Sequence, residues 1–341
     1  MKKFFRTRKS QILLYITFTA CLLTLSGCFP PDVEDSVTVT TIATGLKAPI
    51  GLEIDTKGRV WVAEAGTGNN DGQVSAIFGG TKYDVITNFE SVIAPEGEAD
   101  GPSHLLFSDG VLYILGTGGK MYKVPESSLN PGSSTIEASS LEVEDIGAFV
   151  LSQTFEHPTG ESHPYNLTMG DNKNIYITDA AANAIVRRMP NGDLSIVTEV
   201  PGIPNSTPVG PNPIESVPTG IYYNGHDFLV TTLLGFPFPV DQALIYKISP
   251  SGDVSTYQEG FTSLVDIAKG GPYGRIVLEH GEFGPTGFMP NTGRLAFANG
   301  STITTLTDGL NLPAGMKQAA GYSNTLYVTS LGDNSVLKVV F

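Results

Sequence analysis

Two segments of the chain gather side chains that could hold a cation or move a proton, and two further such side chains follow later. The residues are Glu98, Asp100, His104, Glu161, His163, Asn166, Glu215 and Asp266. Carboxylate and amide oxygens suit Ca²⁺ or Mg²⁺, and a mixture of His and carboxylate ligands suits Zn²⁺. The set indicates a candidate binding face. No motif demands a cofactor, and Ca²⁺ or another divalent cation is the one that this face could hold.

The same residues also fit a solvated acidic rim, which is the interpretation that we favour. No pair of them has the spacing of a metal-binding motif such as His-Glu-x-x-His. The whole chain is acidic, with 34 Asp and Glu residues against 20 Lys and Arg residues. This charge argues against nucleic acid as a partner. Nucleophilic catalysis is not indicated, because the sequence has no Gly-x-Ser-x-Gly motif and we expect no free cysteine in the mature chain.

A second kind of candidate is apolar. Gly235–Pro239 reads Gly-Phe-Pro-Phe-Pro, and the two proline rings stiffen the backbone around Phe236 and Phe238. If these side chains are exposed, they form a recognition element for an apolar or carbohydrate-like partner. If they fold inward, they plug or line a channel. We favour the inward, structural role, because exposing two phenylalanines is costly.

The elements that must position these side chains repeat along the chain. Short runs rich in Val, Ile, Thr and Tyr are separated by turns, and Gly (39) and Pro (23) are frequent. Aligning on a Pro-x-Gly start gives six copies: Ala48–Ile77, Gly101–Val124, His163–Met189, Val217–Ser249, Ser263–Ala298 and Leu312–Val339. Further strands are expected at Asp84–Phe89, Ser195–Val200, Val254–Glu259 and Thr302–Leu306. The repeat predicts an all-β fold, a six-bladed β-propeller with four-stranded antiparallel blades.

Propeller topology then assigns the loops to faces. We expect Val37–Ala43 to pair as the outer strand of the last blade and close the ring. Segments that precede an inner strand, or join the second strand to the third, open on one side, which we call the loop face; the other side is the turn face. The long segments are expected on the loop face, where binding usually resides: Gly66–Gly72, Ser91–Gly101, Ser152–Ser162, Pro201–Ser216, Leu234–Gln242 and Gly281–Gly293.

The N-terminus indicates export. Basic residues precede the apolar stretch Ile12–Leu25, which is too short to span a bilayer comfortably, and Leu25-Ser26-Gly27-Cys28 fits a bacterial lipobox. We therefore expect residues 1–27 to be a lipoprotein signal peptide, residues 28–36 to be a lipidated Cys28 with an acidic tether, and residues 37–341 to be the propeller. The lipid would make the membrane a partner. Phe29 after the cysteine predicts outer-membrane sorting, on a periplasmic or surface side that the sequence leaves open.

The laid-out blades resemble the ScyD/ScyE-type propeller proteins within the NHL and gluconolactonase-like six-bladed group. The similarity is carried by Ala63–Gly68, by His163-Pro164-Tyr165 leading to Thr178–Ala184, and by Val217-Pro218-Thr219 leading to Gly235–Pro239. The third blade departs from the usual Asp-Ala-Gly by having Ala181. This resemblance implies the fold, but the ScyD/ScyE-type family has no agreed activity.

Resemblance to gluconolactonases implies a divalent metal in the channel, held by a Glu before the first blade, an Asn directly after the third-blade Pro and an Asp before a later blade. This sequence has Lys47 before Ala48-Pro49, Tyr165 between Pro164 and Asn166, and Thr219 in the fourth copy. We therefore expect a lipid-anchored cell-envelope propeller that binds an unknown protein or small-molecule ligand on its loop face without catalysis. The alternative is a divalent-metal-dependent hydrolase or lactonase.

Overall fold

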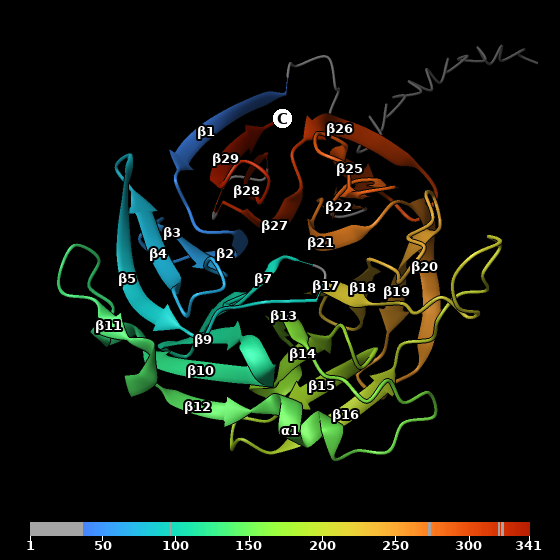
Figure 1. Ribbon diagram of the computed structural model, residues 1–341, viewed down its shortest axis with the longest axis horizontal. Coiled ribbons are helices and arrows are strands. Elements are labelled where there is room, and N and C mark those ends of the chain that lie inside the picture. Colours follow the sequence, from blue (N-terminus) through green and yellow to red (C-terminus); the bar gives the residue numbers. More distant parts are fainter. Residues whose placement is uncertain (1–36, 96, 272–273, 320, 322–323) are drawn as a thin grey trace, which may run out of the picture.

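The computed structural model describes residues 37–341, except for residues 96, 272–273, 320 and 322–323. The expected signal peptide, Cys28 and the acidic tether lie outside the described residues. Six mainly antiparallel sheets stand radially around a central axis and form a closed ring (Figure 1). The fold is the predicted six-bladed β-propeller. Among the described residues no helix is both long enough and apolar enough to cross a bilayer.

Each blade has four principal strands, which run in order from the inner strand outward. Blades 1 to 3 consist of β2 (Pro49–Ile54), β3 (Val60–Glu64), β4 (Gly72–Phe78) and β5 (Thr81–Phe89); β8 (Leu105–Ser108), β9 (Val111–Gly116), β10 (Lys120–Pro125) and β12 (Glu142–Asp145); and β13 (Pro164–Met169), β14 (Ile175–Asp179), β15 (Ala184–Arg188) and β16 (Leu194–Glu199). Blades 4 to 6 consist of β17 (Pro218–Tyr223), β18 (Phe228–Thr232), β19 (Ala243–Ile248) and β20 (Val254–Phe261); β21 (Leu264–Lys269), β22 (Arg275–Glu279), β25 (Gly293–Ala298) and β26 (Ile303–Leu310); and β27 (Pro313–Gln318), β28 (Thr325–Ser330), β29 (Ser335–Val340) and β1 (Thr38–Thr44).

The remaining elements are short. They are β6 (Val92–Ile93), β7 (Ala99–Asp100), β11 (Ile136–Glu137), β23 (Phe283–Gly284), β24 (Gly287–Phe288), the helix α1 (Ile146–Leu151), and the 3₁₀ turns η1 (Thr117–Gly119), η2 (Glu126–Ser128), η3 (Ala138–Ser140) and η4 (Asp171–Lys173). The connection from β10 to β12 is long, although the third-to-fourth-strand connections lie on the turn face. It carries β11, which pairs in parallel with β5 of blade 1. Long segments are therefore not confined to the loop face.

The ring closes as expected. β1 is the outermost strand of blade 6 and pairs antiparallel with β29, so that Thr38 lies opposite Val340 and Thr44 opposite Ser335. The last blade thus contains one strand from the N-terminal part and three from the C-terminal part of the chain. Ring closure leaves no open seam between the first and last blades.

Aromatic side chains join neighbouring blades. Trp61 of blade 1 is fully buried, and its ring meets Phe107 of blade 2 edge-on at 5.5 Å. Tyr176 of blade 3 packs on Phe228 of blade 4 with ring centroids 4.1 Å apart. Pairs with these geometries add to the free energy gained from burying their apolar area.

The Pro-x-Gly repeat has a packing cause. A Cβ atom at Gly51 would lie 2.5 Å from the Ser103 carbonyl oxygen, one at Gly220 would lie 2.6 Å from the Asp266 Cα, and one at Gly315 would lie 2.6 Å from the Ile50 carbonyl oxygen. Inner strands of adjacent blades therefore approach too closely for a side chain at this position in blades 1, 4 and 6. Blades 2, 3 and 5 have His104, Asn166 and Asp266 at the equivalent position, and these three side chains are buried near the axis.

Candidate functional site

The channel contains a hydrogen-bonded pair of predicted site residues. Asn166 Nδ2 donates to Asp266 Oδ1 at 3.3 Å, and Asp266 also accepts from the Ile267 and Met316 backbone amides, each at 2.8 Å. The amide oxygen of Asn166 accepts from the Leu167 amide. Burial raises the pKa of Asp266 to about 6 despite these donors. Asp266 Oδ1 thus accepts two hydrogen bonds from the chain and Asp266 Oδ2 accepts one.

His104 and Tyr165 fill the channel beside this pair. Their side-chain ring centroids are 4.7 Å apart. The Tyr165 hydroxyl donates a hydrogen bond across the channel to the Ala314 carbonyl of blade 6 at 3.2 Å. Neither ring nitrogen of His104 makes a hydrogen bond of ordinary geometry with a described residue, and burial lowers the pKa of this side chain to about 3. Burial also raises the pKa of Tyr165. The channel is thus occupied by a neutral imidazole and a neutral phenol of the chain itself.

A second pair of predicted residues lies at the channel mouth. Asp100 lies on the hairpin of β6 and β7. In Figure 1, β7 is near the middle of the disc formed by the six blades. His163 Nε2 lies 3.3 Å from Asp100 Oδ1, and the His163 amide donates to the buried Asp179 carboxylate at 2.7 Å. Burial opposes a charge on His163, but the hydrogen bond to Asp100 and the negative charge of that residue outweigh burial and raise its pKa.

The other predicted acids do not join these pairs. Glu98 is exposed on the β6–β7 hairpin, Glu161 is exposed in the loop before β13, and Glu215 is exposed in the loop before β17. Over the described part of the chain, no three His, Cys, Asp or Glu residues are placed to hold a metal ion. The eight polar candidates therefore divide into a buried channel group, an ion pair at its mouth and separate surface carboxylates.

The Gly-Phe-Pro-Phe-Pro loop has a divided role. Phe238 is half-buried and packs on Phe283 and Phe288 of the β23–β24 hairpin, with ring centroids 4.6 and 5.1 Å away. Phe236 is 51% exposed, and the Phe236–Pro237 peptide bond is cis. Phe236 also meets Phe283 edge-on, with ring centroids 6.5 Å apart. The loop therefore packs on the β23–β24 hairpin of blade 5, and Phe236 is its more exposed ring.

Phe236 is part of an apolar patch on the loop face. Val209 and Val240 are also about half exposed, at 52% and 47%. Gly210 lies so close to Phe236 that a Cβ there would be 3.3 Å from its Cδ1 atom, so residue 209 is adjacent to this ring. We call Val209, Phe236 and Val240 the apolar patch. Sequence reasoning missed both valines and the supporting Phe283 and Phe288, although the long segment Gly281–Gly293 was a signal for an elaborated loop.

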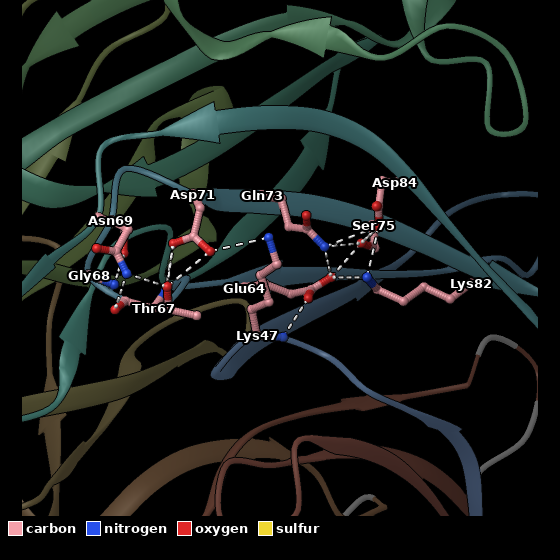
Figure 2. A network of polar contacts seen from close by, with 11 residues as sticks. Lys47, Glu64, Thr67, Gly68, Asn69, Asp71, Gln73, Ser75, Lys82 and Asp84 are labelled. Carbon is pink, nitrogen blue, oxygen red and sulfur yellow. Dashed lines mark hydrogen bonds and ion pairs between the residues drawn. The ribbon is translucent and has the colours of Figure 1, made fainter.

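Blade 1 has a polar network where the gluconolactonase resemblance would require a Glu (Figure 2). The Lys47 amide donates to Glu64 Oε2 at 2.7 Å, and Lys47 Nζ lies 3.2 Å from Asp71 Oδ2. Asp71 also accepts from the Thr67 amide at 2.7 Å, which closes the Gly66–Gly72 loop on itself. Lys82 Nζ lies 3.2 Å from the buried Glu64. Lys47 therefore occupies the position of that Glu, and it contacts Glu64 through its backbone amide and Asp71 through its ammonium group.

Solved structures whose sequences differ widely from this one share its fold. A gluconolactonase from Xanthomonas campestris is 9% identical over 90% of each chain, with a TM-score of 0.59. The PQQ-bound aldose sugar dehydrogenase from Streptomyces coelicolor is 14% identical over 89% of this chain and 98% of its own, with a TM-score of 0.58. A catalytically inactive virginiamycin B lyase from Staphylococcus aureus, solved with quinupristin, is 16% identical over 90% of this chain and all of its own, with a TM-score of 0.55.

No family profile matches the chain, and no curated protein matches it in sequence. At these identities the structural likeness shows the fold alone. The fold and the ring of inner strands define the class of protein: a six-bladed β-propeller whose structural neighbours include gluconolactonase-like proteins, streptogramin B lyases and PQQ dehydrogenases.

Proposed function

We propose that the chain is a lipid-anchored cell-envelope propeller that binds a protein or small-molecule partner on its loop face and does not catalyse a reaction. The observation that carries the proposal is the apolar patch of Val209, Phe236 and Val240. Exposed apolar side chains on neighbouring loops of a rigid scaffold are typical of interaction sites. The Phe238 contacts with β23–β24 hold this loop in place, so partner binding need not order it.

The filled channel also supports binding rather than catalysis. Tyr165 crosses it to Ala314, and the Asp266 carboxylate is satisfied by three nitrogen donors. A reacting substrate at this depth would have to displace these contacts, and each broken one leaves a buried polar group unpaired.

Site-specific photo-crosslinking tests the proposal. Benzoylphenylalanine would replace Phe236 in the apolar patch and, as a control, Phe78, which is 37% exposed at the turn-face end of β4. We expect a discrete crosslinked species in envelope preparations from position 236 and none from position 78. Equal crosslinking from both positions, or none from position 236, would contradict a protein partner at the apolar patch.

A metal-dependent hydrolase or lactonase is the second candidate, favoured by the meeting of Asn166 and Asp266 near the axis. Metal analysis of the purified protein and thermal shifts with Ca²⁺, Zn²⁺ and a chelator separate the two proposals. A metal that binds only the folded state must raise its stability. Tight stoichiometric metal with a chelator-sensitive melting temperature would favour the hydrolase, and we expect neither.

The finer assignments rest on sequence motifs. The segments Ala63–Gly68 and Val217–Pro239 support placing the chain in the ScyD/ScyE-type subgroup. The lipobox ending in Cys28 supports a lipid anchor, and Phe29 supports the outer membrane as its location. Nucleic acid is not expected as a partner, because the net charge is −14.

A further inference from the structure

A cavity of about 800 Å³ lies at the rim of the disc between blades 3 and 4, lined by the loop before β13 and the loop before β17. We call it the rim cavity. Its volume is in the range of small-molecule sites. None of the channel residues His104, Tyr165, Asn166 and Asp266 lines it. The rim cavity is therefore separate from the channel, where a propeller hydrolase would act.

The walls of the rim cavity include apolar surfaces that the fold holds in place. Proline rings line both sides, at Pro158 in one loop and at Pro201, Pro211 and Pro213 in the other. The Asn205 side-chain amide fastens the second loop by donating to the carbonyls of Val209 and Pro211 at 2.8 and 2.7 Å. Proline walls and internal hydrogen bonds keep such a site preformed, which lowers the entropy lost on binding.

The first loop is fastened by an acid that also faces the cavity. The amides of Glu156 and His157 donate to the two carboxylate oxygens of Glu199 at the end of β16. Each oxygen retains a further acceptor site, because a carboxylate oxygen has two lone pairs. Glu199 therefore shapes the wall and still presents negative charge to a ligand.

The charge of the lining has one sign. Glu156, Glu199 and Glu215 line the rim cavity, and its described lining contains no Lys or Arg. The side chains of Glu156 and Glu215 make no hydrogen bond or ion pair with any described residue. His157 is the only basic side chain in that described lining, and its Nδ1 lies 3.7 Å from Glu199. A positively charged ligand would gain electrostatic energy that a neutral or anionic one would not.

We propose that the rim cavity binds a small organic cation, whose ammonium group is attracted by the acidic lining and whose hydrocarbon body lies against the proline rings. This activity goes beyond partner docking on the apolar patch. The acids would attract the charged head of such a ligand, and the proline rings would contact its apolar stem.

Ligand-observed NMR titration of the purified full-length protein tests this inference with three probes of similar shape: 2-phenylethylammonium, neutral 2-phenylethanol and anionic 3-phenylpropionate. We expect the ammonium probe to bind at least about threefold more tightly than the alcohol, and the carboxylate to bind most weakly. The double variant Glu156→Gln/Glu215→Gln should bind the ammonium probe about three- to tenfold more weakly, which is the effect of losing two partly exposed charge pairs. Neither carboxylate supports the fold through a contact, so melting temperature should not change.

The matched control removes two carboxylates from the turn face. Glu126→Gln/Asp227→Asn changes the net charge by the same amount, and neither residue lines the rim cavity. We expect this variant to bind the ammonium probe as the wild type does. Equal binding of amine and alcohol, an equal loss in the control variant, or no binding of the amine would each overturn the inference. None of these outcomes bears on crosslinking at Phe236, so the two proposals fail separately.

Discussion

Asn166 and Asp266 stand 100 residues apart in the sequence and meet in the channel, where Asn166 Nδ2 lies 3.3 Å from Asp266 Oδ1. Each takes the position that glycine occupies in blades 1, 4 and 6. The carboxylate joins blades 3, 5 and 6 through hydrogen bonds from Asn166, Ile267 and Met316. Stability and pH dependence of the ring should therefore be sensitive to this one side chain.

Asp266 should make the stability of the protein fall as pH rises from about 4 to about 6. Its pKa is raised from 3.8 to about 6 in the folded chain, so the folded state keeps a proton that the unfolded state releases near pH 4. The favourable contribution is complete below pH 4 and lost above pH 6, and amounts to roughly 3 kcal/mol. Urea unfolding of wild type and Asp266→Asn between pH 3.5 and 7 measures it. A difference between the two proteins that does not vary with pH would refute this assignment.

His163 should titrate above its ordinary range because of Asp100. Asp100→Asn removes the ion pair and should lower the His163 pKa, measured from its imidazole NMR signals. The interaction stabilises the fold at low pH and is lost as pH rises through the raised pKa. Asp109→Asn is the control, since Asp109 pairs with Lys173 on the turn face. An unchanged His163 pKa in Asp100→Asn would show that the pair is not formed in solution.

Gly51→Ala should destabilise the ring by about 2 kcal/mol or more. The added methyl group would overlap the Ser103 carbonyl oxygen and the His104 ring, both within 2.7 Å, so the inner strands would have to separate. Gly235→Ala is the matched control, because its Cβ would meet Glu215 at an ordinary 3.4 Å. Chemical denaturation compares the two. Equal stabilities would mean that the inner strands have room for side chains at this position.

The two phenylalanines of the Gly-Phe-Pro-Phe-Pro loop should behave differently. Phe238→Ala loses contacts with Phe283 and Phe288 and should cost roughly 1–3 kcal/mol, less than a fully buried ring would. Phe236→Ala should cost under about 0.5 kcal/mol, as surface substitutions usually do, yet abolish partner crosslinking from a probe placed at Val209. Melting curves of the two variants suffice for the stability comparison. A larger loss in Phe236→Ala would identify that ring as a packing residue.

Cys28→Ser should move the protein from the membrane fraction to the soluble fraction. The acyl chains attached to a lipobox cysteine would be the anchor, and a serine cannot accept them through a thioether. Fractionation followed by detection of the protein measures the change. Continued membrane association of the variant would show that another feature holds the protein there.

The ring could be predicted from the sequence because its repeat has a packing cause. Gly51, Gly220 and Gly315 recur where adjacent inner strands nearly touch, and strand-forming runs follow each of them. The outer strand of blade 2 was missed. β12 is Glu-Val-Glu-Asp and is mostly exposed, so it has none of the alternation that marks a strand with one buried face. The long connection before β12, which carries β11 on blade 1, also places β12 farther from β10 in the sequence than the repeat predicts.

The site was less predictable than the ring. The approach of Asn166 to Asp266 follows from their equivalent strand positions, which topology brings to one axis. Glu98, Glu161 and Glu215 lie in loops whose paths depend on contacts with other blades, such as Glu199 holding Glu156 and His157. Local sequence patterns do not encode such contacts. The same reason explains why the aromatic support from Phe283 and Phe288 could not be foreseen.

The pairing of β1 with β29 also sets how the propeller would stand on a membrane. Thr38 lies opposite Val340 at the turn-face end of blade 6, whereas Thr44 lies at the loop-face end. The described part of the chain therefore begins at the turn face of the disc. If Cys28 carries the proposed lipid, the anchor would approach the disc from its turn face. The apolar patch on the loop face would then lie on the side of the disc opposite the anchor.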